Sequence, residues 1–310
     1  METPSSLVIG IPRALLYHRY AVLWRVFFKE LGVKVTVSGP TSRKVLEEGS
    51  GLAVDETCLS AKIFFGHVKE LIGRCDYILI PRINTFGHHR DMCVRFQSLY
   101  DQARNIFRGT EQKFLSYNVD MEFEISEKDA FLEMGQFLGF AKLDVKRAYA
   151  AARKEDQRDW KEQLRRQEQR LKANGLKILL VGHSYVLWDS YIGKAVTDFL
   201  REIDVTPIRA DIVNREAALK RSAELSPTCK WEVSRELLGG IAEYKKSVDG
   251  VILVSAFPCG PDAMVNELLT RKLEGIPLLN LVLDSQSGTA GIETRLESFV
   301  DIIRLKKGVL

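Results

Sequence analysis

In the first half of the chain, short apolar or alternating segments typical of strands are followed by segments whose apolar residues have helical spacing. Short apolar or alternating runs predict strands at 7–11, 33–37, 52–54 and 77–80. Apolar residues spaced three or four apart predict helices at 15–31, 42–48 and 57–72. Strands and helices that follow one another in this way favour a parallel sheet covered by helices on both faces.

The second half of the chain repeats this plan. Strands are expected at 177–181, 206–209, 250–254 and 278–283. Helices are expected at 192–203, 215–224, 233–246, 262–274 and 292–305. The segment 131–174 has a helical composition with sparse apolar positions, so it is interpreted as a connector that crosses the surface. The pattern therefore predicts an α/β protein with two Rossmann-like (flavodoxin-like) parallel-sheet domains, 1–145 and 176–310, which face each other across a cleft and are joined by a connector helix, 146–175.

Composition excludes several classes of protein. The chain has 310 residues, 45% hydrophobic and 28% charged, which excludes a disordered chain, a collagen-like repeat and a disulfide scaffold. No apolar stretch approaches the ~20 residues needed to cross a bilayer. The first six residues lack a basic region followed by an apolar one, so no signal peptide and a cytoplasmic location are expected.

The net charge of +4 is concentrated in the connector. Only Trp160 is aromatic between residues 150 and 172, and no nucleic-acid motif is present, so nucleic-acid binding is disfavoured. This basic helix is interpreted as a solvated face, with docking of an acidic partner as the alternative.

Unusual residues gather where the predicted strands end, at the edge where open parallel sheets bind ligands. Three of the five cysteines lie there, Cys58, Cys93 and Cys259, and Cys58 and Cys259 also begin predicted helices. A helix N-terminus lowers the pKa of a thiol and favours the thiolate that binds metals or attacks carbon. Cys75 and Cys229 lie elsewhere and are interpreted as structural.

Several chemistries remain open at these residues. A zinc ion could be held by the three cysteines together with His88 or His89, although no short ligand spacing supports it. A reactive cysteine could use His67 or His183 as its base. Nucleotide binding is not indicated, because neither G-x-G-x-x-G nor G-x-x-x-x-G-K-[ST] occurs after a strand. Arg13 and Arg82 follow strands and could bind an anion such as a CoA phosphate, or form structural salt bridges.

A set of short motifs distributed over nearly the whole chain resembles a known family. The motifs are 9–13 (IGIPR), 52–59 (LAVDETCL), 65–67 (FGH), 77–82 (YILIPR), Cys93 with Phe96, 181–183 (VGH), 259–262 (CGPD) and 291–299 (GIETRLESF). In combination they resemble the acyl-CoA dehydratase activase-related proteins. That family is a branch of the group that includes 2-hydroxyacyl-CoA dehydratases, benzoyl-CoA reductases and double-cubane cluster proteins.

This resemblance implies an iron–sulfur cluster, either [4Fe-4S] or a double cubane, with Cys58, Cys93 and Cys259 as its ligands. It also implies electrons from a separate ATP-dependent activase, and low-potential electron transfer or reductive chemistry on a small molecule or acyl-CoA in anaerobic metabolism. The residues expected around the substrate or the cysteines are Arg13, Glu56, His67, Arg82, His183, Asp262 and Asp284. A non-catalytic electron carrier or scaffold is the alternative, and a homo-oligomer remains open.

The sequence departs from the family's usual pattern in the last loop, 284–291. A histidine and two acidic residues of that pattern are replaced, and Asp284 remains. The departure affects proton-handling groups and leaves all three cysteines in place.

Overall fold

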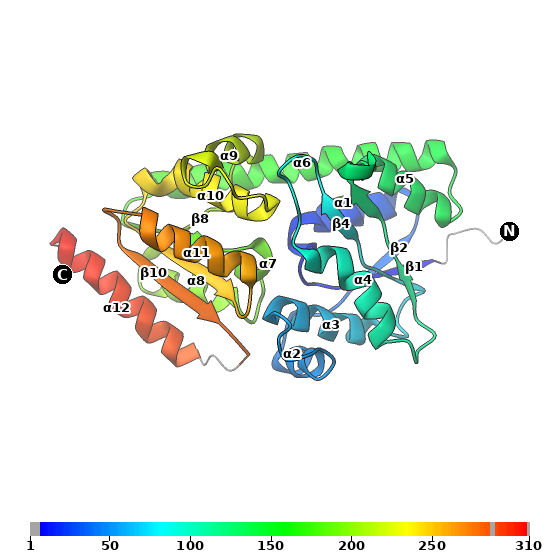
Figure 1. Ribbon diagram of the computed structural model, residues 1–310, viewed down its shortest axis with the longest axis horizontal. Coiled ribbons are helices and arrows are strands. Elements are labelled where there is room, and N and C mark those ends of the chain that lie inside the picture. Colours follow the sequence, from blue (N-terminus) through cyan, green and yellow to red (C-terminus); the bar gives the residue numbers. More distant parts are fainter. Residues whose placement is uncertain (1–6, 286–288, 309–310) are drawn as a thin grey trace. The chain divides into compact units, whose positions relative to one another are not determined.

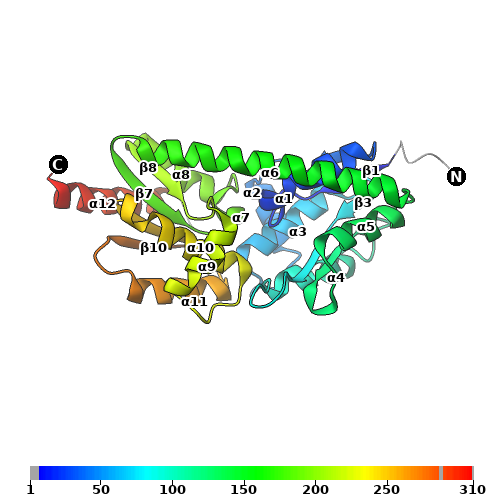
Figure 2. The same ribbon diagram turned by 90° about the horizontal axis from the view of Figure 1, so that it is seen from above.

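The computed structural model describes residues 7–285 and 289–308 (Figure 1). The chain divides into two compact units, Met1–Lys161 and Glu162–Leu310, which are described separately below. The division falls inside one long helix, α6 (Lys142–Lys172), which is continuous in Figure 2. This helix occupies most of the segment expected to be the connector.

The first unit is built on a parallel four-stranded sheet. Its strands are β1 (Val8–Ile11), β2 (Lys34–Val37), β3 (Tyr77–Leu79) and β5 (Lys113–Leu115). Their order is β2-β1-β3-β5, so the chain places β2 on one side of β1 and β3 on the other. The helices are α1 (Tyr17–Glu30), α2 (Arg43–Ser50), α3 (Leu59–Leu71), α4 (Val94–Ile106) and α5 (Glu127–Phe137).

A second pair of strands continues the last two strands of this sheet. β4 (Arg82–Thr85) and β6 (Asn118–Asp120) pair in parallel, directly after β3 and β5. Pro81 has no backbone N–H to donate, so it interrupts the regular ladder between β3 and β4. The Ile80 N–H still donates to the Leu115 carbonyl at 2.8 Å, which keeps the two pairs in line.

Aromatic side chains fill the core of the first unit. The ring of Phe27 meets the edge of Phe131 at 4.8 Å between centroids. The indole N–H of Trp24 donates to the Tyr117 hydroxyl at 2.9 Å, so the two polar atoms among these rings satisfy each other. Phe27 and Phe131 are fully buried, and their contact ties α1 to α5.

The second unit is built on another parallel four-stranded sheet. Its strands are β7 (Leu176–Val181), β8 (Val205–Arg209), β9 (Gly250–Ala256) and β10 (Leu278–Leu283). Their order is β10-β9-β7-β8, so β8 lies on one side of β7 and β9 on the other. Counted in chain order, both sheets have the order 2-1-3-4, which is that of flavodoxin-like folds. The predicted α/β class with parallel sheets is confirmed.

Helices cover the sheet of the second unit. They are α7 (Ser184–Leu187), α8 (Gly193–Glu202), α9 (Arg215–Arg221), α10 (Glu232–Tyr244), α11 (Gly260–Lys272) and α12 (Thr289–Lys307). Helix α8 packs with α12, whereas α10 packs with α9 and α11. Every residue of β9 is buried, as expected for a strand covered on both faces.

Two expectations from the hydrophobic pattern were wrong. Residues 52–54, expected to be a strand, form a turn after α2, in which the N–H groups of Leu52 and Ala53 donate to the carbonyls of Gly49 and Ser50. The stretch that begins at Arg82, expected to follow a strand as a loop, is strand β4. The segment 131–174, helical in composition, contains the end of α5 and then α6, with a turn at Gly139 where φ is +90°.

Candidate functional site

Each of the three cysteines singled out in the sequence stands at the beginning of a helix. Cys58 is the N-cap of α3, Cys93 of α4 and Cys259 of α11. All three are half-buried, and none of the three side chains makes the capping hydrogen bond itself. The backbone N–H groups and the positive end of each helix dipole therefore favour negative charge next to each thiol.

The other two cysteines have the opposite surroundings. The Cys75 thiol donates to the Leu71 carbonyl at 3.5 Å, and burial raises the pKa of Cys75 to about 11. Its sulfur lies so close to Gly10 that a Cβ there would be 2.5 Å away. Cys229 packs against the apolar core of the second unit, and burial raises its pKa as well. Both thiols are disfavoured as thiolates, which fits the structural role expected for them.

The strand order of the second unit places two loops at one topological switch point. The chain leaves β7 towards β8 on one side and returns to β9 on the other, so the loops after β7 and β9 diverge from adjacent strands. Open parallel sheets bind ligands at this position. His183 follows β7, and Cys259 and Asp262 follow β9.

These three side chains are close together. The His183 Nε2 and Asp262 Oδ1 atoms are 2.6 Å apart, and the two residues are only 3% and 5% exposed. One ligand atom from each of His183, Cys259 and Asp262 lies within 4.8 Å of the other two. The His183 ring also stacks on Tyr185, with 4.9 Å between centroids, which helps to fix its orientation. His183 and Asp262, which were expected near the cysteines, therefore lie next to Cys259 within the second unit.

Gly182 permits this arrangement. A Cβ on Gly182 would lie 2.5 Å from the Val254 carbonyl oxygen of β9. Only glycine therefore lets the chain leave β7 so close to its neighbour and place His183 at the sheet edge.

The switch point of the first unit has different contents. Between the ends of β1 and β3 lies a cavity of only about 10 Å³, lined by Pro12, Ala14, Leu15, Leu16, Trp24, Phe64, Leu79, Ile80, Pro81 and Leu99. The lining is apolar, and the volume is about the minimum that one water molecule requires.

The polar residues predicted in the first unit do not line this cavity and contact other residues of the unit. The Arg13 backbone N–H donates to Ser38 Oγ at 2.8 Å. His67 is fully buried, with Nε2 2.9 Å from the Thr41 hydroxyl, and burial lowers its pKa to about 4. Arg82 forms an ion pair with Asp101 and lies over the Tyr100 ring at 4.6 Å.

The four other predicted residues, Glu56, Asp284, His88 and His89, do not form part of a cluster of possible ligands among the described residues. Glu56 is exposed in the turn before α3, and Asp284 is exposed after β10. Asp284 begins the altered loop 284–291, and residues 286–288 of this loop lie outside the described part of the chain. The rings of His88 and His89 contact each other at 3.9 Å. Across the described residues of the first unit, no three His, Cys, Asp or Glu side chains gather within 4.8 Å, so a zinc site built there from His88 or His89 gains no support.

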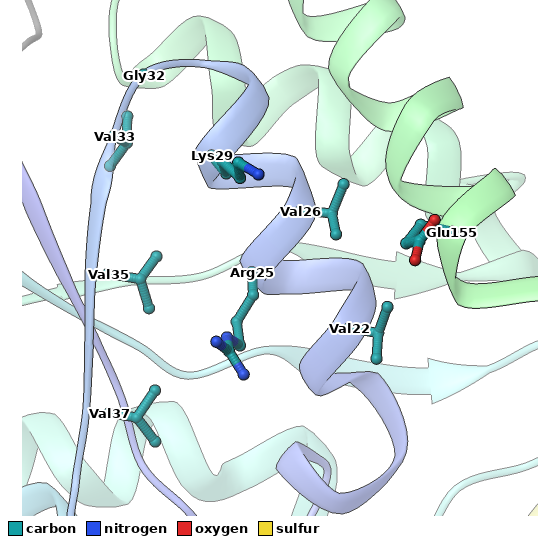
Figure 3. Close-up of a pocket in the computed structure, with 9 residues that line it drawn as sticks. All are labelled: Val22, Arg25, Val26, Lys29, Gly32, Val33, Val35, Val37 and Glu155. Atoms are coloured by element: carbon teal, nitrogen blue, oxygen red, sulfur yellow. The ribbon is translucent and has the colours of Figure 1, made fainter. Parts of the chain in front are cut away.

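A separate groove of about 650 Å³ lies along α1 and the edge strand β2 (Figure 3). It is lined by Val22, Arg25, Val26, Lys29, Gly32, Val33, Val35, Val37 and Glu155. It contains none of the predicted site residues, and the pattern of the sequence gave no signal for it.

Comparison with known proteins identifies the family. Residues 8–213 match the sequence profile of the family described as CoA enzyme activase uncharacterised domain (DUF2229). The chain belongs to this CoA enzyme activase domain family. The resemblance to acyl-CoA dehydratase activase-related proteins, predicted from the motifs, is confirmed over this range, whereas 259–262 and 291–299 lie beyond the matched residues.

Two further comparisons concern curated proteins and solved structures. No curated protein matches the chain. Two solved structures align over 96% of this chain and 98% of their own: ZnuA, at 11% identity and a TM-score of 0.29, and a Mn-bound periplasmic metal binding protein from candidatus liberibacter asiaticus, at 12% and 0.27. Among the described residues, no helix has the length and apolar character needed to span a membrane.

Proposed function

We propose that this CoA enzyme activase domain protein is an iron–sulfur protein of the dehydratase system, with Cys58, Cys93 and Cys259 as the cluster ligands. The observation that carries the proposal is that each of these cysteines, and neither Cys75 nor Cys229, is the N-cap of a helix. Thiolates are the ligands of Fe–S clusters, and a cluster with thiolate ligands is negatively charged.

The residues present fit such a group. Half-buried thiols at helix N-termini are accessible to iron, and the neighbouring backbone N–H groups stabilise negative charge on the sulfur atoms. A bound cubane would supply low-potential electron transfer, and three cysteines leave one iron for another ligand. The role of the chain is to hold the thiolates and to surround them with N–H donors.

The electrons come from a separate ATP-dependent activase in this proposal. Two observations support a separate activase: the description of the family names CoA enzyme activases, and the sequence lacks both common phosphate-binding glycine motifs. The substrate class in this proposal is a small molecule or an acyl-CoA. The alternative, a cluster protein that only carries electrons, uses the same ligands.

Anaerobic reconstitution of the full chain with iron and sulfide tests the cluster. We expect brown protein with bound iron and acid-labile sulfide, and loss of both in Cys58→Ala, Cys93→Ala and Cys259→Ala. The matched controls Cys75→Ala and Cys229→Ala should keep the colour. A colourless wild type, or a cluster that survives all three substitutions, would refute the proposal.

Turnover separates an enzyme from a carrier. The reconstituted protein is mixed with a reduced activase, ATP and a panel of acyl-CoA compounds, and product is measured by mass spectrometry. Reduction of the cluster without conversion of any compound would assign the carrier role instead.

A further inference from the structure

We propose that the second unit binds one divalent transition-metal ion through Cys259, His183 and Asp262, with no ligand from the first unit. The site shares Cys259 with the cluster proposed above but does not rest on it. It uses neither Cys58 nor Cys93, and it concerns the chain without a cluster.

Proximity is the first argument for this site. One ligand atom of each side chain lies within 4.8 Å of the other two, which is the spacing at which a single ion can contact all three. His183 and Cys259 follow β7 and β9, which are hydrogen-bonded neighbours in the sheet, and Asp262 lies in the first turn of α11. The pairing of the two strands therefore brings the three residues together.

Two buried polar atoms at the site are the second argument. The Nδ1 atom of His183 and the Oδ2 atom of Asp262 are buried and have no hydrogen-bond partner among the residues that the structure describes. Buried polar atoms are normally paired, so unpaired ones at a single site point to a missing ligand. A cation bound by the carboxylate would satisfy Oδ2.

The contact between His183 and Asp262 suits a metal ligand. Nε2 of His183 and Oδ1 of Asp262 are 2.6 Å apart, so one proton lies between them in the metal-free chain. An ion that replaces this proton would contact Nε2 and Oδ1, and Oδ2 would remain available to the same ion.

The donor set selects the class of ion. A thiolate, an imidazole and a carboxylate together suit Zn²⁺, Fe²⁺ or Co²⁺, whereas Mg²⁺ and Ca²⁺ prefer sites made only of oxygen. Three protein ligands also leave a position open for water. When the ion binds, the thiol proton of Cys259 is released and a metal–sulfur bond forms.

An ion can reach the site from solvent. Cys259 is half-buried, and the adjacent Gly260 is exposed, with no atom outside its own helix and chain neighbours within 4 Å of the position that a Cβ would occupy. Solvent therefore reaches the residue that carries the sulfur, while the histidine and the carboxylate stay buried.

Titration of the full, chelator-treated chain with Co²⁺ in the absence of sulfide tests the inference. We expect one ion per chain and a thiolate-to-cobalt charge-transfer band. The double variant with Cys58→Ser and Cys93→Ser should keep both, as should Cys229→Ser. Cys259→Ser and His183→Ala should lose the band, and Asp262→Asn should weaken binding roughly 10–100-fold.

Alkylation of the wild type gives a second measurement that needs no variant. Zn²⁺ should protect Cys259 from iodoacetamide and leave Cys58 and Cys93 unprotected, as measured by peptide mass spectrometry. The inference is overturned if Co²⁺ does not bind saturably, if binding requires Cys58 and Cys93, or if Zn²⁺ leaves the modification rate of Cys259 unchanged. Failure to form an iron–sulfur cluster would not affect either result.

Discussion

The two units have the same strand order, but different side chains occupy their switch points. In the first unit, the switch point between β1 and β3 is filled by apolar side chains around a cavity of about 10 Å³. In the second unit, the switch point between β7 and β9 brings together His183, Cys259 and Asp262. This topology provides a position for a functional site, and the loop residues decide whether reactive side chains or only packed apolar side chains lie there.

The polar residues predicted in the first unit are not among those that line its cavity. The Arg13 backbone contacts Ser38, and Thr41 contacts His67, so the loops after β1 and β2 and helix α3 are joined by internal hydrogen bonds. These contacts hold the first unit together. Buried polar atoms without a hydrogen-bond partner among the described residues occur in both units. They include His67 Nδ1 in the first unit, and His183 Nδ1 and Asp262 Oδ2 in the second.

The largest effect is expected from emptying the apolar switch point. Leu16→Ala removes a side chain that is 5% exposed and lines the small cavity, so it should cost about 2–5 kcal/mol of unfolding free energy. Hydrogen exchange of the β1 and β3 amides measures this loss within the first unit. Leu143→Ala, at a position that is 59% exposed, is the control and should change stability by less than about 0.5 kcal/mol. Equal effects of the two substitutions would contradict the comparison.

Acid should weaken the first unit through His67. Burial lowers the pKa of His67 from 6.5 to about 4. As the pH falls, His67 is therefore protonated in the unfolded chain at a higher pH than in the folded chain. Stability is therefore complete above pH 6.5 and is lost progressively towards pH 4, by about 3 kcal/mol in total. Urea unfolding between pH 7 and pH 4.5 measures this loss, and His67→Gln should remove that part of the pH dependence. An unchanged pH dependence in the variant would show that other groups are responsible.

Breaking the polar pair should destabilise the second unit. Asp262→Ala leaves the buried Nε2 of His183 without its acceptor, which should cost about 1–3 kcal/mol in metal-free protein. Asp262→Asn keeps an acceptor oxygen and should lose less. Hydrogen exchange of the β7 and β9 amides in the presence of a chelator compares the two. If Asn is as harmful as Ala, the contact between the two side chains does not stabilise the metal-free unit.

The smallest effect concerns the backbone at the apolar switch point. Leu15 has φ +51°, a left-handed conformation that favours glycine, although its side chain is buried. Leu15→Gly and Leu15→Ala lose the same packing apart from one methyl group, so Gly should be more stable than Ala by about 1 kcal/mol. Ala14→Gly is the control and should lower stability, because Ala14 is not among the residues with positive φ. Thermal unfolding of the set resolves the difference in sign.

The hydrophobic pattern predicted most strands and helices because both sheets are parallel and buried. Runs such as 177–181 and 250–254 have few polar interruptions, and their strands β7 and β9 lie at the centre of the second sheet. The pattern failed where local hydrogen bonding decided the structure. The run at 52–54 closes the end of α2, and the short strands β4 and β6 follow an interruption at Pro81.

The sequence by itself determined the fold class, the family and the choice of three cysteines, because these depend on periodicity, on short motifs and on residues that precede predicted helices. Tertiary structure decided that Cys93 is a helix N-cap like the other two cysteines, and that His183 contacts Asp262. It also decided that only one of the two switch points is polar. The physical reason is that strand order brings together loops that are far apart in the chain, and no local pattern of residues specifies which side chains then meet.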